Sequence, residues 1–155
     1  MTPEQEQQFN EYGCACRCLI ELSKRQNKKI TKDEFTSRYA NRYSNWSTMF
    51  GVADKPRASD LAKELNLCSG TQDINDKDRV KEIFNNNKSK GILVFTEKSL
   101  VPNRSHETVY HCLLLTNLNS DQWELFHPDK NGKDYLLTVS DVKLQSLLPS
   151  FLVLT

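Results

Sequence analysis

The chain has 155 residues, of which 37% are hydrophobic and 26% charged, which is typical of a folded domain with a core of its own. The formal net charge is +1, so the chain lacks the basic excess that drives binding to nucleic acids or acidic membrane surfaces. We therefore expect one domain over residues 1–155 and no nucleic-acid partner.

The N-terminal sequence lacks the basic and then apolar segments of an ordinary signal peptide, and no apolar run is long enough to span a membrane. The five cysteines are Cys14, Cys16, Cys18, Cys68 and Cys112. An odd number of cysteines without a signal peptide indicates reduced thiols rather than a disulfide framework. Three of them alternate along Gly13–Cys18, which leaves a small metal-binding protein as an alternative. Structural zinc usually needs a second closely spaced pair, so we expect neither a metal nor another cofactor.

The first half of the chain has the spacing and the capping residues of helices. Apolar side chains recur at helical spacing from about Cys14 to Gln26. A capping box at Thr31–Glu34 predicts the start of a second helix. A third helix is predicted to begin at Ser59, and a fourth lies around Val80–Phe84.

The second half of the chain has short β-branched and aromatic runs, bounded by turn-forming residues, that predict strands. These runs are Ile92–Thr96, Val109–Thr116, Gln122–His127, Tyr135–Val139 and Phe151–Leu154. The segment Asn117–Asp121 is predicted to form a hairpin turn, and Asp141–Leu148 a short helix. Helices followed by an antiparallel sheet predict the α+β class rather than an alternating α/β arrangement.

Cys14 lies at the start of the first of these predicted helices. Unpaired main-chain amides and the helix dipole at that position favour a thiolate, so we expect a lowered thiol pKa. Cysteine catalysis needs such a thiolate, a histidine that takes its proton, and donors for the oxyanion. Cys18, one turn later, is expected to face the core. Taken alone, Cys14 is better explained as a small buried side chain without chemistry.

Three histidines are available as the base. His111 lies in an apolar predicted strand, where a lone histidine is usually a satisfied core residue. His127 ends the next predicted strand, while His106 lies in a polar loop and is expected to be solvated. If the two strands pair through Asn117–Asp121, His111 becomes a neighbour of the segment His127–Asp129 across the hairpin.

Four short elements follow one another in a familiar order. Gln8 is followed after five residues by Cys14, and Cys18-Leu19 then enter the amphipathic helix. Much later, His111 begins an apolar strand segment, and the next strand ends at His127-Pro128. In this order the chain resembles the papain-like cysteine peptidases. The similarity is to the branch that processes bacteriocin leader peptides and to related bacterial effector proteases and glutamine deamidases.

The resemblance implies a papain-like α+β fold in which N-terminal helices pack on a C-terminal antiparallel sheet. It implies Cys14 as the nucleophile and His111 as general base and then general acid. It also implies that Gln8 and the Cys14 amide stabilise the oxyanion. The residue that orients the base is open, because His127 occupies the position where the family has an aspartate or asparagine. Asp129 is the nearest carboxylate, and we favour it because a carboxylate also stabilises the imidazolium.

We therefore expect a cysteine-dependent amide hydrolase, a protease or a protein-glutamine deamidase, that works through a thioester intermediate. Its substrate would be a protein, and we expect the enzyme to be a monomer. Without a signal peptide, it would be cytoplasmic or delivered into a target cell by a specialised bacterial secretion system. The resemblance then implies an effector or toxin that modifies a protein of a host or rival. The alternative is a binding or immunity protein that keeps the papain fold without catalysis.

Overall fold

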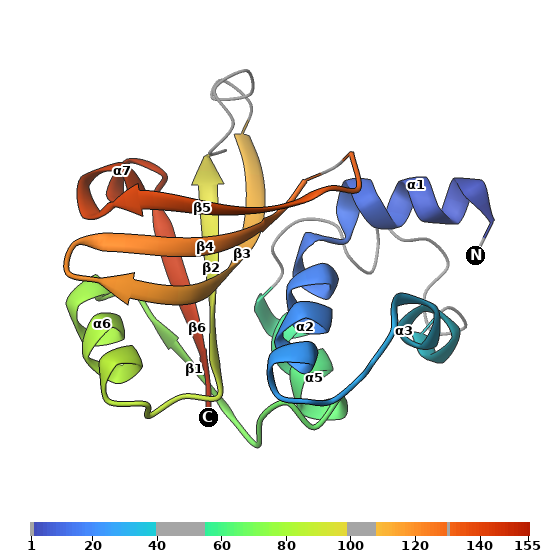
Figure 1. The fold of residues 1–155 in the computed structure, drawn as a ribbon, viewed down its shortest axis with the longest axis horizontal. Coiled ribbons are helices and arrows are strands. Elements are labelled where there is room, and N and C mark those ends of the chain that lie inside the picture. Colours follow the sequence, from blue (N-terminus) through green and yellow to red (C-terminus); the bar gives the residue numbers. More distant parts are fainter. Residues whose placement is uncertain (1, 40–54, 99–107, 130) are drawn as a thin grey trace.

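A six-stranded sheet, antiparallel throughout, forms the centre of the computed structural model, which describes residues 2–39, 55–98, 108–129 and 131–155 (Figure 1). The strands are β1 (Thr71–Ile74), β2 (Gly91–Lys98), β3 (Thr108–Asn119), β4 (Gln122–Pro128), β5 (Asp134–Ser140) and β6 (Pro149–Leu154). Their order across the sheet is β1-β6-β2-β3-β4-β5, so β1 and β5 are the edges. The expected antiparallel sheet is confirmed, although β1 was not among the predicted strands.

Helices cover both faces of the sheet (Figure 1). They are α1 (Pro3–Tyr12), α2 (Cys14–Arg25), α3 (Lys32–Tyr39), α5 (Lys55–Glu64), α6 (Lys77–Asn85) and α7 (Asp141–Ser146). Residues of α2 and α5 share one apolar cluster with Cys112 and Leu114 of β3. Leu113 and Leu115 instead join a second cluster with residues of α6 and α7. This alternation is the two-residue period of a strand that is buried on both sides. None of the helices in the described ranges is long and apolar enough to cross a bilayer.

The helix α1 was missed by the sequence analysis. Its ten residues include only Pro3, Phe9 and Tyr12 besides Glu, Gln and Asn, so the apolar period that reveals α2 is absent. A capping box starts it, since the Thr2 hydroxyl accepts from the Gln5 amide and the Gln5 side chain accepts from the Thr2 amide. The expected helix start at Ser59 is also wrong. That helix begins at Lys55, because a proline in its first turn costs no helical hydrogen bond.

Gly13 joins α1 to α2 without a spacer. Its amide donates to the Phe9 carbonyl oxygen at 2.8 Å, which closes α1, and α2 begins with the next residue. A Cβ atom on Gly13 would lie 2.2 Å from that same oxygen. Only glycine fits this junction, and the junction fixes where Cys14 starts its helix.

The hairpin of β3 and β4 is tighter than predicted at its turn and open at its other end. The turn is Ser120-Asp121, with Ser120 at a φ of 60°, rather than the whole segment Asn117–Asp121. The register of the pair ends at Leu114↔Phe126, although β3 extends back to Thr108 and β4 forward to Pro128. The two strands therefore part at this end, and the candidate site lies at the opening.

Candidate active site

The first turn of α2 lies against the part of β3 that β4 no longer pairs. The Cys112 amide donates a hydrogen bond to the Cys14 sulfur, and the Cys18 thiol donates to the Cys112 carbonyl oxygen at 3.4 Å. In an antiparallel strand the amide and carbonyl of one residue point to the same side. Cys14 and Cys18, one helical turn apart, thus take the place of a neighbouring strand beside Cys112.

The environment of Cys14 keeps its thiol protonated. Its side chain is 8% exposed, and burial raises the pKa to about 11, with Cys18 adding to the rise. Hydrogen bonds from the Cys112 and Ala15 amides and the charge of Arg17 act in the opposite direction but are the smaller causes. The expected lowering of the pKa by the helix start is therefore wrong for this state, because desolvation outweighs the helix end.

The other cysteines nearby are buried in the same way. Cys16, Cys18 and Cys112 are almost fully shielded from solvent, and burial raises the pKa of Cys16 and of Cys112 well above its usual range. All five cysteines of the chain are free thiols. Within the described ranges, no three histidine, cysteine or acidic side chains are grouped so as to hold a metal ion.

His111 and His127 form a direct pair across the opening. Their Nε2 atoms are 2.9 Å apart, and the rings meet edge to face with centroids 4.5 Å apart. A hydrogen bond between two Nε2 atoms needs one donor and one acceptor, so the two rings cannot both be cationic while it forms. His127 is 2% exposed, and its ring also lies near that of Tyr135 in β5, with centroids 6.3 Å apart. The expected approach of these histidines across the hairpin is confirmed.

Cys14 lies beside the residue that follows His111, but no hydrogen bond joins Cys14 to the His111 imidazole in the described part of the structure. The Cys14 sulfur lies at the amide of Cys112, the residue next to His111. Among the hydrogen bonds of the described residues, Cys14 has none to an imidazole. Strand alternation explains this, because His111 shares the side of Leu113 rather than that of Cys112. The His111 imidazole therefore lies on the face of β3 opposite to the Cys112 side chain.

The structure describes Asp129 and Gln8 less fully than Cys14 and the histidine pair. The Asp129 amide donates to the Lys133 oxygen at 2.8 Å and its own oxygen accepts from the Gly132 amide at 3.0 Å, so its main chain forms the turn after β4. The His111 imidazole contacts that of His127. Gln8 lies within α1, but its side chain, like the whole of His106, falls outside the described part of the structure.

Sequence reasoning missed Arg17. This arginine is buried, although it shares a side of α2 with Glu21 and Lys24, and it forms an ion pair with Asp134 at 2.6 Å. The signal was an arginine between Cys16 and Cys18 in an otherwise apolar helix turn, because a buried arginine always needs partners.

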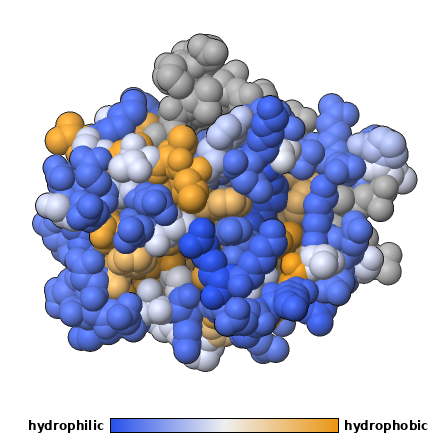
Figure 2. Space-filling model, in the orientation of Figure 1, coloured by the Kyte–Doolittle hydropathy of each residue, from blue (hydrophilic) through white to orange (hydrophobic). Residues whose placement is uncertain are grey.

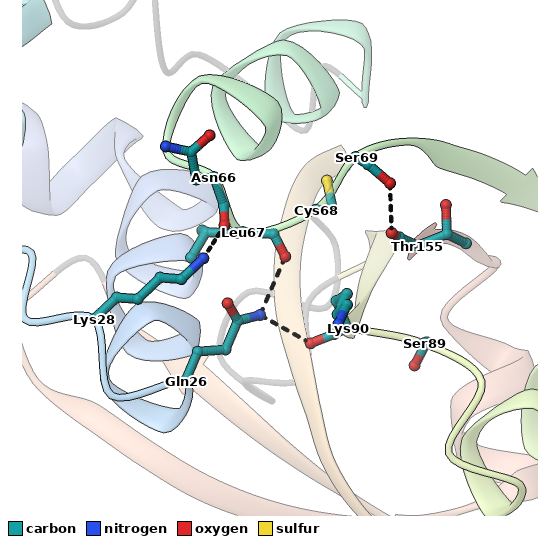
Figure 3. A pocket seen from close by; sticks show the side chains of 9 residues that line it. All are labelled: Gln26, Lys28, Asn66, Leu67, Cys68, Ser69, Ser89, Lys90 and Thr155. Carbon is teal, nitrogen blue, oxygen red and sulfur yellow. Dashed lines mark hydrogen bonds between the residues drawn. The ribbon is translucent and has the colours of Figure 1, made fainter.

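A polar pocket of about 610 Å³ opens beyond the far end of α2 (Figure 3). It is lined by Gln26, Lys28, Asn66, Leu67, Cys68, Ser69, Ser89, Lys90 and Thr155. Two of its side-chain donors are used within the wall, since Gln26 Nε2 donates to the main-chain oxygens of Leu67 and Lys90 and Lys28 Nζ donates to that of Asn66. A helix of twelve residues separates this pocket from the Cys14 end of α2.

The chain matches no protein-family model, and a search of curated proteins finds none similar to it.

Proposed function

We propose that this protein is a cysteine-dependent amide hydrolase with Cys14 as nucleophile and His111 as base. One observation supports this most: a cysteine at a helix start lies beside the residue that follows His111, and His111 is paired with His127. Under the proposal, the nucleophile, the base and the group that orients the base lie around the opening between β3 and β4, and the imidazole of His111 must approach Cys14 from the face of β3 opposite to Cys112. This is the constellation that acyl transfer through a thioester requires.

The raised pKa of Cys14 decides how such a reaction would start. A thiol with a pKa of about 11 is not a resting thiolate, so His111 would take the proton as the sulfur attacks the amide carbon. His111 would then give that proton to the departing nitrogen, leaving a thioester on Cys14. Water, deprotonated by His111, would hydrolyse the thioester and restore the thiol. Catalytic hydrogen bonds are often long without substrate. We expect the imidazole to reach the sulfur in a minor conformation of the free protein, which substrate binding would favour.

Exposed apolar side chains beside the site support a protein as the proposed substrate. Figure 2 shows apolar atoms gathered over the sheet within a largely hydrophilic face. On the edge strand β5, Tyr135 and Leu136 are exposed, and Tyr135 lies against His127. Peptide-bond cleavage and glutamine deamidation share one thioester intermediate, so both belong to the proposal. From the family resemblance, we extend it to an effector or toxin that modifies a protein of another cell.

A second candidate function is supported by the state of Cys14. Its burial and raised pKa are those of an inert structural thiol, as in a papain-fold binding or immunity protein without catalysis. Under this alternative, the histidine pair would serve only to hold the opening together.

The reactivity of Cys14 toward iodoacetamide separates the two functions without a known substrate. For the hydrolase, alkylation of Cys14 at neutral pH depends on His111, and His111→Ala should slow it by about 10²-fold, as for loss of a general base. The same substitution should leave Cys68, in the pocket at the far end of α2, alkylated at an unchanged rate. Equal Cys14 rates in both proteins would favour the binding protein.

A further inference from the structure

Arg17 links α2 to both ends of the turn between β4 and β5. Its side chain is 8% exposed. One terminal nitrogen donates to the main-chain oxygen of Asp129 at 2.5 Å and to that of Asn10 at 3.4 Å. The other donates to the Lys133 oxygen at 3.0 Å and to Asp134 Oδ1 at 2.6 Å. The planar guanidinium fork suits such paired contacts, which an ammonium group cannot reproduce.

The end of β4 that carries His127 is buried and lies beyond the register that β4 shares with β3. Beyond Leu114↔Phe126, its partner strand in the described register is β5, through His127↔Tyr135. β5 is itself an edge of the sheet. A two-stranded ribbon is only marginally stable by itself, so hydrogen bonds from α2 to the turn after β4 add to what holds His127 in place.

We propose that Arg17 is a positioning residue that holds His127 against His111 by fastening the β4–β5 turn to α2. The proposal rests on the proposed function, since the histidine pair orients the base there. The partly buried hydrogen bonds to the main-chain oxygens of Asp129 and Lys133 contribute most to this attachment. The Asp134 carboxylate is half-exposed, where ion pairs contribute little.

The test measures the tautomers of His111 and His127 from the nitrogen NMR resonances of their imidazoles, in the full-length protein at neutral pH. His111→Gln and His127→Gln assign the signals. In the unsubstituted protein we expect one ring with a protonated Nε2 and the other accepting at Nε2, each in a single tautomer. In Arg17→Gln and in Arg17→Lys this signature should be lost, and both rings should show averaged tautomers. Arg25→Gln, an exposed arginine of the same helix, should keep it.

Asp134→Asn covers the case in which Arg17→Gln does not fold. This variant removes the ion pair but keeps the buried arginine, so the two histidines should keep their single tautomers. Arg17→Lys then shows whether the paired contacts of the guanidinium group are required. A paired signature that persists in a folded Arg17→Lys variant overturns the proposal, as does its absence from the unsubstituted protein. Iodoacetamide rates at Cys14 are measured on the same proteins. A Cys14 rate independent of His111 would reject the hydrolase while leaving the resonance result, and thus the positioning role, to stand on its own.

Discussion

The Cys18 thiol donates to the main-chain oxygen of Cys112 at 3.4 Å, while the amide of the same residue donates to the Cys14 sulfur. Two thiols of one helix turn thus satisfy a stretch of β3 that has no neighbouring strand on that side. Buried main-chain groups without partners are costly, so this contact lets the sheet open between β3 and β4 without leaving them unsatisfied. The opening, in turn, is what lets the first turn of α2 reach the main chain of Cys112.

The first prediction concerns that contact. Cys18→Val keeps a buried apolar side chain but removes the donor, so the free energy of unfolding should fall by about 1 kcal/mol. Cys18→Ser restores a donor at the same position and should recover part of the loss. Urea unfolding of the three proteins measures the difference. Equal stability of the valine and unsubstituted proteins would show that the contact contributes nothing.

The second prediction is a pH dependence of stability due to Cys14. Its pKa rises from an ordinary 9.0 to about 11 on folding, so the folded state prefers the thiol. That preference is fully present below pH 9 and is lost as the pH rises toward 11, because the unfolded chain releases the proton first. The loss amounts to roughly 3 kcal/mol, at 1.4 kcal/mol for each pKa unit.

The comparison for this prediction is Cys14→Ala. Burial also raises the pKa of Cys16 and of Cys112, so stability should fall above pH 9 in both proteins. The loss of unfolding free energy above pH 9 should be smaller in Cys14→Ala, because the contribution of the Cys14 thiol is then missing. Parallel curves of unfolding free energy between pH 8 and 10.5 would contradict a raised pKa at this thiol.

The elements with a strong period or a capping motif were predictable from the sequence. The apolar spacing that begins at Cys14 marks α2, and the capping box at Thr31–Glu34 forms as expected, since the Glu34 amide donates to the Thr31 hydroxyl. The meeting of His111 with His127 followed from pairing neighbouring strands. Each of these depends on interactions between residues close in sequence or joined by a short turn.

What the sequence could not supply depends on distant contacts. The pKa of Cys14 is decided by how deeply the first turn of α2 is buried under β3, which no local pattern encodes. Arg17 finds its partners more than a hundred positions away, at Asp129, Lys133 and Asp134. The burial of Arg17 depends on the packing of the β4–β5 turn against α2.

The third prediction concerns the helix junction. In Gly13→Ala the new methyl group would collide with the Phe9 oxygen, so α1 and α2 would have to separate. We expect a loss of well over 1 kcal/mol in unfolding free energy, together with a change in Cys14 alkylation. Gly70→Ala is the matched control, because its methyl group would meet only the Thr155 hydroxyl, at 3.2 Å. Similar thermal unfolding of both variants would contradict the role of the junction.

The fourth prediction concerns Gln8 as an oxyanion donor. An interaction made only in the transition state lowers kcat and leaves substrate affinity nearly unchanged. Gln8→Ala should therefore reduce kcat on the order of 10²–10³-fold, as for other single oxyanion donors. Steady-state kinetics on a protein substrate measures this. A change confined to KM would assign Gln8 to ordinary substrate binding.

The last prediction decides which residue orients His111. Position in the chain offers both His127 and Asp129, and a carboxylate would have the chemical advantage of stabilising an imidazolium. The described contact, however, is between His111 and His127 at 2.9 Å. We therefore expect the larger loss of turnover from His127→Ala, and a partial recovery in His127→Asn, whose amide can again accept from or donate to the imidazole. The pH profile distinguishes the two roles. The hydrogen bond between the two imidazoles is lost when both are protonated, so we expect it to contribute to the fall of activity at acidic pH. The pH at which activity falls should therefore shift when His127 is replaced, whereas Asp129→Asn should leave that pH unchanged. A uniform loss across the pH range in Asp129→Asn would instead make the carboxylate the orienting group, since the wrong tautomer would then prevail at every pH. Near-full activity of both variants would reduce the site to Cys14 and His111 alone.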